Sequence, residues 1–491
     1  MNNKTDIVMI RPNDQKSVYG DTYKYIACEP PYWMALAGEY VRDGGAKVVL
    51  IDAEAQNLSF EKVAGRVEEL HPNIVGIFVT GTNLSASTQK MQGARLTCDA
   101  IRKCIPDQTI FLWGLHPSAL PEDTLKECDC DMIVKGEGFD TMIALAKKQY
   151  KSLEELSDIC FFSDGQYTYT GTKGLLSTDK LPMPAWDMLD MSKYNPHNWH
   201  IMGEGNPEDA KGRYGVISTS IGCPFNCSFC AISAQFGERK VRFWDVDRVI
   251  SEIDRLVRDY NTKYIKILDE CFVLKKEYVE AFCDKLITRN YDLNIWAYAR
   301  VDTVSEELLA KLRKAGIKWL AYGIESGDDN TLADVSKGQF TANQTLQAMK
   351  WTKEADINII ANFMFGLPED TYETMRKSLE LAKAINPEWI NFAVTMAYPG
   401  SRDYFSYREK KQISSTNWIE YAQYSYECTP MGSRYLSPKE VLEYRDWAFG
   451  DFFEGNERYF DLIRNKFGEQ YVENIQKMIK KRLRRKLLEN T

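Results

Sequence analysis

The chain has 491 residues, of which 44% are apolar and 27% are charged, and its net charge at pH 7 is −8. These values are close to those of ordinary globular proteins, so they predict about two to four folded domains and exclude a chain that is disordered throughout. The acidic balance does not favour a protein that coats nucleic acid, and no run of about 18 apolar residues is present that would span a membrane.

Twelve cysteines are too few for a disulfide scaffold in a chain of this length. The first residues, Met-Asn-Asn-Lys-Thr-Asp-Ile-Val, lack the apolar core of a signal peptide. We therefore expect a cytoplasmic protein.

The N-terminal third alternates short apolar strands with helical periodicity. The strands are predicted at 6–10, 47–51, 74–79, 109–113 and 132–134, and the helices at 32–42, 61–70, 87–104 and 121–127. Continuous apolar strands separated by helices predict a parallel sheet that is covered on both faces, a doubly wound Rossmann-like domain. Such sheets bind ligands beyond the carboxyl ends of their strands.

The loops at those strand ends are rich in glycine and small polar residues, which allow a ligand to approach the backbone closely. They are Arg11-Pro12-Asn13, the 81–87 loop with Ser85 and Ser87, Gly114-Leu115-His116-Pro117, and Lys135-Gly136-Glu137-Gly138. His116 is either a ligand contact or a residue that orders its own loop. The residues alone do not identify the ligand.

A connector without regular periodicity follows from about 150 to 207. It contains a predicted hairpin at 163–167 and then the Pro184-Ala185-Trp186-Asp187 segment, in which prolines favour an extended backbone.

Six strand and helix pairs come next. The strands are predicted at 214–218, 264–268, 293–299, 319–324, 357–365 and 389–394, and helices fill the gaps between them. This pattern predicts a parallel barrel or its open three-quarter form, with all strand carboxyl ends on one rim. Charged residues, glycines and prolines gather at that rim: Asp269, Glu270, Arg300, Glu325, Ser326, Gly366 and Pro368. Some of them have ordinary alternatives, since Gly366 can serve as a turn glycine and Arg300 as a surface ion pair.

Three cysteines stand at the end of the first barrel strand with C-x3-C-x2-C spacing: Cys223, Cys227 and Cys230. Thiolates suit zinc or iron–sulfur clusters. A structural zinc site normally needs four ligands, and no second pair stands nearby. Three thiolates without a fourth favour a cubane cluster that keeps one iron open to a small molecule.

With Phe229 directly before the last cysteine, the motif resembles the signature of the radical S-adenosylmethionine (SAM) superfamily. The resemblance implies that the three cysteines hold a [4Fe–4S] cluster, that SAM caps its fourth iron, and that the reduced cluster cleaves SAM to a 5′-deoxyadenosyl radical. It also implies that Glu325, Ser326 and the turn with Gly366 and Pro368 line the SAM pocket, and that backbone beside Phe229 meets the adenine.

Arg300 has a fork geometry that suits the carboxylate of SAM. Asp269 and Glu270 resemble the acidic pair after the second strand in this class, either as a general acid and base or as groups that orient SAM or the substrate.

The N-terminal third resembles the cobalamin-binding domain that precedes one large radical SAM class. The His116-Pro117 loop and the Gly136-Glu137-Gly138 turn carry this resemblance, and they imply that Asn13, Ser85, Ser87, Gly114, His116 and Glu137 contact cobalamin. Trp113 departs from the usual glycine and is expected to narrow the slot for the nucleotide tail. No Asp-x-His-x-x-Gly motif is present, so no histidine ligand of cobalt is expected.

The sequence therefore predicts four parts: a cobalamin-binding-like domain at 1–150, a connector at 151–207, a radical SAM core at 208–400 and a C-terminal helical segment at 401–491. In that last segment, aromatic residues at helical spacing indicate core packing or a substrate pocket. The basic run 480–488 is predicted to be a solvated amphipathic helix, with contact to nucleic acid, an anionic membrane surface or an acidic partner as the alternatives.

The expected activity is hydrogen abstraction from an unactivated carbon of a small polar substrate, with sugars as one candidate type, followed by cobalamin-assisted methyl transfer. A non-methylating dehydration or rearrangement and a cluster- or cobalamin-based sensor are the alternatives. A flavodoxin or ferredoxin is the expected electron donor.

Overall fold

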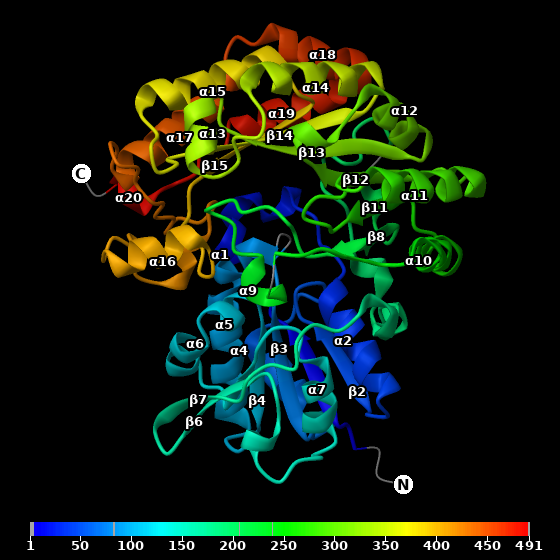
Figure 1. Cartoon of the computed structure of the whole chain (residues 1–491), viewed down its shortest axis with the longest axis vertical. Coiled ribbons are helices and arrows are strands. Elements are labelled where there is room, and N and C mark those ends of the chain that lie inside the picture. Colours follow the sequence, from blue (N-terminus) through cyan, green and yellow to red (C-terminus); the bar gives the residue numbers. More distant parts are fainter. Residues whose placement is uncertain (1–3, 82–83, 206, 238, 490–491) are drawn as a thin grey trace.

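The computed structural model describes residues 4–81, 84–205, 207–237 and 239–489, so Thr82 and Asn83 of the predicted 81–87 loop lie outside the described residues. A sheet from the N-terminal third fills the lower half of Figure 1, and a second sheet with its covering helices fills the upper half. The doubly wound sheet, the partial barrel and the C-terminal helices that the sequence predicts are confirmed. Within the described residues, no helix has the length and apolar character needed to cross a membrane.

The first sheet has the strand order β2-β1-β3-β4-β5-β6-β7. Its first five strands are parallel, and β6 and β7 are antiparallel additions at one edge. The strands are β1 (Ile7–Arg11), β2 (Val48–Asp52), β3 (Ile74–Val79), β4 (Ile110–Gly114), β5 (Met132–Val134), β6 (Ile159–Ser163) and β7 (Gln166–Tyr169). Every residue of β1, β3 and β4 is buried, as expected of strands that helices cover on both faces.

The helices of this part are α1 (Gln15–Tyr19), η1 (Gly20–Tyr25), α2 (Tyr32–Asp43), α3 (Phe60–Leu70), η2 (Leu84–Lys90), α4 (Met91–Cys104), α5 (Leu115–Ala119), α6 (Pro121–Glu127) and α7 (Phe139–Ala146). The helix predicted from residue 87 begins later, because a kink at Ala86 and a 3₁₀ segment precede α4. The Trp113 indole is fully buried against Phe78 and donates to the carbonyl oxygen of Glu137 at 3.0 Å. It therefore belongs to the core of the sheet.

The connector differs from its prediction at its start. The expected hairpin forms β6 and β7, and β6 pairs with β5, so this hairpin extends the first sheet. The rest consists of short turns: η3 (Leu153–Glu155), η4 (Thr178–Lys180), η5 (Trp186–Met188), η6 (Met191–Lys193) and α8 (Pro207–Ala210).

The second sheet has six parallel strands in the order β8-β11-β12-β13-β14-β15, which is an open barrel. The strands are β8 (Tyr214–Ile217), β11 (Tyr264–Ile267), β12 (Asn294–Ala299), β13 (Ile317–Glu325), β14 (Asn358–Phe365) and β15 (Trp389–Val394). The covering helices are α10 (Val246–Tyr260), α11 (Lys276–Arg289), α12 (Glu306–Lys314), α14 (Ala342–Glu354) and α15 (Tyr372–Ile385). The helix ends follow local chemistry: Asp245 caps the first turn of α10, and Asn261 ends that helix in the left-handed conformation.

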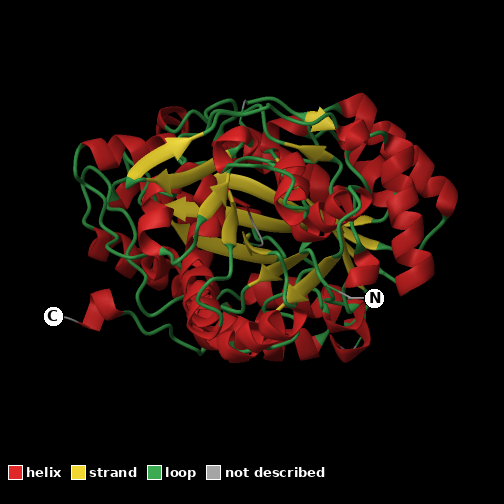
Figure 2. Cartoon of the chain, turned by 90° about the horizontal axis from the view of Figure 1, so that it is seen from below, coloured by secondary structure: helices red, strands yellow, loops and turns green. Residues whose placement is uncertain are grey.

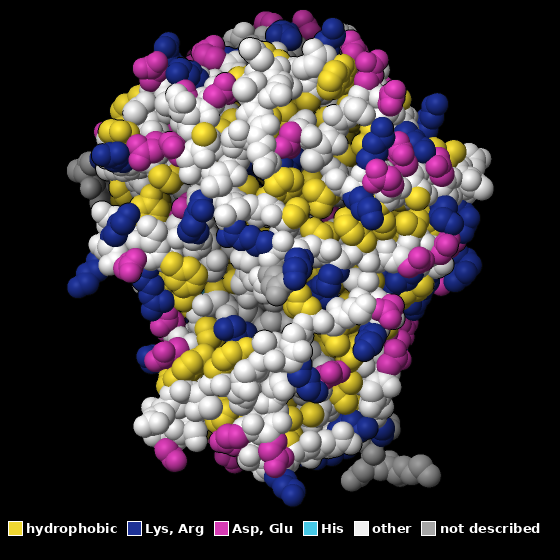
Figure 3. Space-filling model, viewed as in Figure 1, with side chains coloured by type: hydrophobic (Ala, Val, Ile, Leu, Met, Phe, Trp, Pro, Cys, Tyr) yellow, Lys and Arg dark blue, Asp and Glu magenta, His cyan; other side chains and the backbone are white. Residues whose placement is uncertain are grey.

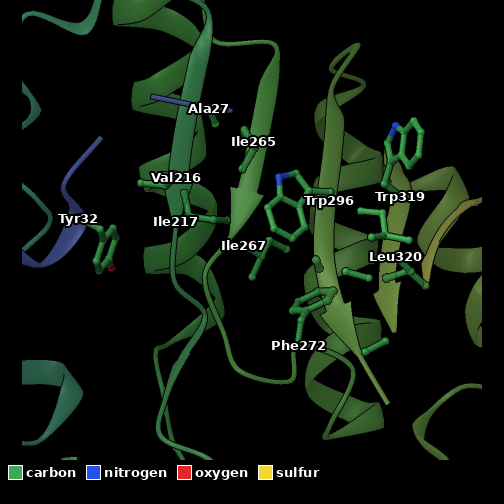
Figure 4. Packing of buried hydrophobic residues seen from close by; sticks show 14 of the residues in the cluster. Ala27, Tyr32, Val216, Ile217, Ile265, Ile267, Phe272, Trp296, Trp319 and Leu320 are labelled. Carbon is green, nitrogen blue, oxygen red and sulfur yellow. The ribbon is translucent and has the colours of Figure 1, made fainter. Parts of the chain in front are cut away.

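The shorter elements of this half are β9 (Ser220–Ile221), which pairs with β10 (Arg242–Phe243), α9 (Ser233–Phe236), η7 (Val301–Thr303) and α13 (Asp329–Asp334). Helices surround the strands in Figure 2. Figure 4 shows how apolar side chains of successive strands fill the interior, from Val216 and Ile217 on β8 to Trp319 and Leu320 on β13. This core is what fixes the strand ends that carry the site.

The C-terminal segment contains α16 (Arg402–Glu409), η8 (Trp418–Tyr421), α17 (Pro438–Phe453), α18 (Glu457–Phe467), α19 (Glu469–Ile479) and α20 (Lys486–Glu489). The prediction of a continuous helix over 480–488 is wrong, because α19 ends at Ile479 and α20 begins only at Lys486. The predicted solvent exposure holds for the basic side chains of this run other than Arg485. The side chain of Arg485 is buried and donates to Asp446 and to the carbonyl oxygens of Gln423 and Ser425. An arginine drawn inward in this way holds the basic run against the protein.

Candidate active site

A cavity of about 1050 Å³ opens where the carboxyl ends of the barrel strands meet the first sheet. Its walls come from the cysteine loop, from β11 to β15, from the C-terminal helices and from the first domain. The first domain contributes Tyr19, Thr22, Tyr25, Ile26, Ser85, Ala86 and Gln89. The two halves of the chain therefore build one chamber.

The cysteine loop lies on the wall of this cavity. Cys223, Cys227 and Cys230 are all half-buried and all line it. The loop needs glycine at position 222, where φ is +91° and a Cβ atom would collide with the carbonyl oxygen of Lys240. Cys230 Sγ lies 3.5 Å from the hydroxyl of Ser85, so the first domain reaches the loop directly.

Ser228 anchors the middle of the loop. Its backbone N–H donates to the carbonyl oxygen of Val335 at 3.1 Å, and its hydroxyl donates to Asp403 Oδ2 at 2.9 Å. Burial raises the pKa of the Cys223 and Cys230 thiols to about 12. These thiols must lose their protons when a metal binds, and metal binding would supply the charge that makes this possible.

Within the described residues, no three His, Cys, Asp or Glu side chains are grouped closely enough to hold a single metal ion. A saturated zinc site needs such a group, whereas the thiolates of an iron–sulfur cubane each bind a different iron and stand farther apart. Three half-buried thiols on one loop that faces a cavity are a donor set that fits a cubane.

The acidic pair after β11 is divided between two roles. Glu270 lines the cavity, and burial raises the pKa of its carboxyl to about 7. Asp269 is buried outside the cavity lining, and its carboxylate accepts hydrogen bonds from Thr219 N–H at 2.6 Å, Thr219 Oγ1 at 2.5 Å and Ser220 Oγ at 2.6 Å. The expected catalytic role does not suit Asp269, because these bonds commit both of its oxygens to holding the end of β8.

Arg300 and Glu325 both line the cavity beside the cysteine loop. The Arg300 guanidinium is held by Asp302 through two bonds of 2.9 Å and by Gln339 Oε1 at 3.0 Å. It also stacks on Phe225, with its central carbon 3.8 Å from the ring centroid. Much of the fork expected to bind a carboxylate is therefore already engaged.

Lys337 is a residue that the sequence reasoning missed. Its buried ammonium group lies 2.5 Å from Glu325 Oε1 and 5.8 Å from the centroid of the Phe229 ring. It lines the cavity, and no strand-end motif indicates it because it stands in a loop 12 residues after Glu325. Glu325 itself has φ of +65°, an uncommon conformation for a residue with a side chain.

Ser326, Gly366 and Pro368 lie outside the lining of the cavity. Ser326 is buried with its hydroxyl 3.3 Å from Ser378 Oγ, and Gly366 donates its N–H to Asp370 Oδ2 at 3.0 Å. The carbonyl oxygen of Pro368 accepts the backbone N–H of Arg434 at 2.8 Å. These contacts stabilise the turns after β13 and β14.

In the first domain, Ser85 is the predicted ligand contact that lines the cavity; the others are engaged elsewhere. The Asn13 amide donates to the carbonyl oxygen of Leu58 at 3.1 Å. Glu137 binds Arg242 and accepts the backbone N–H of Leu176 at 2.9 Å. Gly114 has φ of +142°, and a Cβ atom there would collide with the carbonyl oxygen of Val79.

His116 is fully buried and orders its loop. Its backbone N–H donates to Ser87 Oγ at 2.8 Å, its Nδ1 lies 3.0 Å from Thr88 Oγ1, and Trp418 covers its ring at 4.4 Å between centroids. Burial lowers the pKa of this histidine to about 3. Tyr19, Ser85 and Gln89 instead line the cavity, and their hydroxyl and amide groups are of the kind that suits the amide-bearing rim of a corrin. Thr22 also lines it, with its hydroxyl donated to the carbonyl oxygen of Tyr19 at 2.6 Å.

The lining also includes apolar and aromatic residues of β14, β15 and the C-terminal segment: Phe363, Met364, Trp389, Phe392, Tyr424 and Phe449. The C-terminal segment adds charged residues to the same lining: Arg445, Asp446, Asp451, Glu454, Lys481 and Arg482. A polar ladder joins β15 to β14: Trp389 Nε1 donates to Asn391 Oδ1 at 3.1 Å, and Asn391 donates to Asn362 Oδ1 at 2.9 Å.

Two family models match the chain. The radical SAM superfamily model matches residues 217–382, and the B12 binding domain model matches residues 20–146. The first covers the barrel with the cysteine loop, and the second covers most of the first sheet.

Curated relatives match over most of their length. An uncharacterized methyltransferase of Pyrococcus horikoshii is 29% identical over 80% of this chain and 81% of its own. The anaerobic magnesium-protoporphyrin IX monomethyl ester cyclase of Rubrivivax gelatinosus is 27% identical over 84% of this chain and 72% of its own.

Solved structures share the fold. The radical SAM methyltransferase TsrM of Kitasatospora setae, solved with cobalamin and a [4Fe–4S] cluster, aligns with a TM-score of 0.66 at 18% identity, over 84% of this chain and 78% of its own. The cobalamin-dependent SAM radical enzyme OxsB, solved with aqua-cobalamin and SAM, aligns with a TM-score of 0.70 at 17% identity, over 96% of this chain and 70% of its own.

Proposed function

The chain belongs to the radical SAM superfamily, in the class with an N-terminal B12-binding domain, and from this premise we propose that it is a methyltransferase acting on an unactivated carbon. Its cofactors are a [4Fe–4S] cluster, SAM and cobalamin. The observation that carries the proposal is the shared cavity, in which the cysteine loop of the barrel and Ser85 of the first domain lie 3.5 Å apart.

Cys223, Cys227 and Cys230 would hold the cluster, and Tyr19, Ser85 and Gln89 would contact the corrin rim. When bound, the cluster supplies the electron that cleaves SAM, and cobalamin supplies the methyl group for transfer. The protein's own part is to keep these groups in line and to exclude water from the chamber.

For SAM, we propose that Lys337 meets the carboxylate, because its ammonium group has three N–H donors and one bond, to Glu325, among the described residues. The Nε and Nη2 donors of Arg300 are instead bonded to Asp302 and Gln339. Glu325 holds the Lys337 ammonium in place at 2.5 Å, and Phe229 lies beneath it. Arg300 adds positive charge to the same wall. Backbone beside Phe229 remains the proposed contact of the adenine.

Glu270 is the proposed acid–base group. It lines the cavity next to the cysteine loop, and its pKa of about 7 allows it to hold or release a proton near neutral pH. Asp269 positions the end of β8, on which the cysteine loop begins.

The substrate proposed from the sequence was a small polar metabolite. The aromatic residues of the lining support a larger substrate with an extended apolar part, since a sugar would leave Trp389, Phe392 and Phe449 without apolar contact. The charged residues of the C-terminal segment in the same lining support polar groups elsewhere on this substrate. The Asn362–Asn391 ladder would give such a substrate one polar contact point.

A non-methylating radical reaction is the second candidate. It is favoured by the first domain, where His116, Ser87 and Glu137 are engaged within the protein. A sensor function has less support, because Glu270 and Lys337 provide an acidic and a cationic side chain in the cavity that the cysteine loop lines.

Reconstituted protein tests these candidates when it is incubated with SAM and dithionite. Release of 5′-deoxyadenosine distinguishes the enzyme from a sensor. Expression with added cobalamin then separates the two enzymes: corrin absorbance in the purified protein supports methyl transfer, and its absence contradicts the proposed methyltransferase and favours the non-methylating reaction. The expected compartment remains the cytoplasm.

A further inference from the structure

Helix α16 and the basic turn that follows it are bonded to the cysteine loop and contribute no residue to the lining of the cavity. We propose that this surface, formed by residues 402–411, docks a small acidic electron-carrier protein. The inference rests on the proposed function, because it needs an acceptor of electrons at the three cysteines.

Hydrogen bonds join α16 to the cysteine loop. The backbone N–H of Asp403 donates to the carbonyl oxygen of Ser228 at 3.0 Å, and the hydroxyl of Ser228 returns a bond to Asp403 Oδ2 at 2.9 Å. Ser228 stands next to Cys227 and two residues before Cys230. An electron arriving at α16 therefore crosses one of these two hydrogen bonds and a few covalent bonds to reach the sulfur atoms.

A second contact fixes the same helix. Arg402 donates to Ser336 Oγ at 3.0 Å, and the neighbouring Val335 carbonyl oxygen accepts the N–H of Ser228 at 3.1 Å. The base of α16 and the back of the loop are thus one bonded unit, so a protein that docks on α16 has a fixed position relative to the cysteines.

The outer face of this unit is basic although the whole chain carries a charge of −8. Four cations, Arg402, Arg408, Lys410 and Lys411, are exposed on it, together with Glu409. Asp403, the other carboxylate of this stretch, is buried. In Figure 3, Lys and Arg side chains spread across the waist of the molecule, at the height where Figure 1 places α16.

Two of these four cations make no ion pair that would stabilise the fold. Lys410 and Lys411 have no ion-pair partner in the part of the chain that the structure describes, whereas Arg408 contacts Asp123 at 2.9 Å. Phe405, on the same helix, is 49% exposed. A short stretch with an exposed apolar side chain and an excess of exposed cations matches the small, charge-steered interfaces of electron-transfer complexes.

The electron transfer balances without atom movement. The reduced carrier gives up one electron, the group held by the cysteines takes up one electron, and no bond forms or breaks at the docking surface.

Charge reversal tests the proposal with flavodoxin as the probe. The double variant Lys410→Glu with Lys411→Glu changes two exposed side chains that have no ion-pair partner among the described residues, and a triple variant adds Arg402→Glu. The matched control is Arg258→Glu with Lys477→Glu, since these side chains are 72% and 71% exposed and lie on α10 and α19. The rate of reduction is followed by loss of the visible absorbance of the holoenzyme, with reduced flavodoxin or with dithionite.

We expect reduction by flavodoxin to slow about tenfold in the double variant, and further in the triple variant, while dithionite reduces every variant at the wild-type rate. The wild-type rate with flavodoxin should also fall as salt is added, because long-range attraction is screened. Equal flavodoxin rates in wild type and variants, or a rate that does not respond to salt, overturn the proposal.

Failure of the proposed function has a different signature. In that case dithionite releases no 5′-deoxyadenosine from the wild type. The docking surface is then tested by calorimetric binding of oxidised flavodoxin, which needs no electron transfer: binding lost in the charge-reversal variants supports the surface, and unchanged or absent binding contradicts it.

Discussion

Both parallel sheets place polar residues at the carboxyl ends of their strands, but the surroundings of these residues differ. At the carboxyl ends of the barrel strands, Glu270, Arg300 and Glu325 face an open cavity. At the carboxyl ends of the first sheet, His116 and Glu137 are buried in contacts with the protein itself. The difference comes from what lies above each edge: the barrel rim faces a chamber, whereas η8 places Trp418 on His116.

The charges at the two edges differ in the same way. At the first sheet, Arg11 binds Asp52 at 2.8 Å, and Lys90 binds Asp14 at 2.5 Å and Glu54 at 2.9 Å, all buried. Such a closed network fixes geometry but leaves little capacity for a ligand. A strand end therefore indicates where a site can be, and the neighbouring packing decides whether its side chains are available.

The largest expected effect is at the barrel. Replacing Cys223, Cys227 and Cys230 with alanine should abolish iron binding and 5′-deoxyadenosine release, because three thiolates are the proposed ligands. Cys271→Ala is the matched control, since this buried cysteine also lines the cavity. Iron content and product release are measured after anaerobic reconstitution. Iron retained by the triple variant, or lost from the Cys271 variant, would contradict the ligand assignment.

The sequence predicted the architecture well because both sheets are buried on two faces. Fully apolar runs such as Ile74–Val79 and Ile110–Gly114 have few alternatives to a parallel strand. The cysteine motif was also readable, since its spacing is local.

The sequence did not predict which side chains face the cavity. Asp269 and Glu270 are neighbours, yet one binds the β8 end and the other faces the cavity. Lys337 joins the site through the tertiary fold alone, and the basic run after Ile479 is not helical before Lys486 and buries Arg485 against Asp446. Each of these outcomes depends on contacts between segments far apart in the chain, which a local pattern does not contain.

The next effect separates the two acids after β11. Glu270→Gln should lower the rate of the chemical step about 100-fold if Glu270 acts as acid or base, with the wild-type pH profile changing near its pKa of about 7. Asp269→Asn should mainly lower stability, because it disturbs the bonds to Thr219 and Ser220. Rates across pH and unfolding midpoints distinguish the two. A Glu270→Gln enzyme with the wild-type pH profile removes this residue from the chemistry.

The raised pKa of Glu270 should also make the free energy of unfolding depend on pH. A carboxyl whose pKa is raised on folding binds its proton more tightly in the native state, so stability falls as pH rises from about 4.5 to about 7. Glu270→Gln should remove that part of the decline. Denaturant unfolding at pH 5 and pH 8 measures it, and an equal decline in both proteins would contradict the raised pKa.

Lys337 comes third. Lys337→Met should weaken SAM binding about 30-fold, which corresponds to the loss of about 2 kcal/mol for a charged hydrogen bond. The control is Lys377→Met, which removes an exposed lysine that binds Asp328 at 2.9 Å outside the cavity. Calorimetric titration with SAM gives both affinities. Equal SAM affinities in the two variants would contradict the Lys337 contact and favour Arg300 as the partner of the carboxylate.

The smallest effect is expected at the first sheet, and it tests whether the residues at the strand ends of that sheet take part in ligand binding. Gln89→Ala removes one cavity-facing group and should weaken cobalamin binding about fivefold, the value of one hydrogen bond of about 1 kcal/mol. His116→Phe should leave that affinity unchanged, because His116 faces Trp418 and Thr88. Both affinities are compared from the absorbance of the cobalamin that each variant retains after gel filtration.

His116 should instead affect stability in acid. Its pKa is lowered to about 3 by burial, so the native state holds it neutral while the unfolded chain takes up a proton below pH 6.5. The wild type therefore loses stability as pH falls from 6.5 towards 3, and His116→Phe loses less over that range. A different outcome would be loss of cobalamin from His116→Phe and its retention by Gln89→Ala. The first sheet would then bind its ligand through the residues at its strand ends, as the barrel does, which would contradict the contrast between the two sheets.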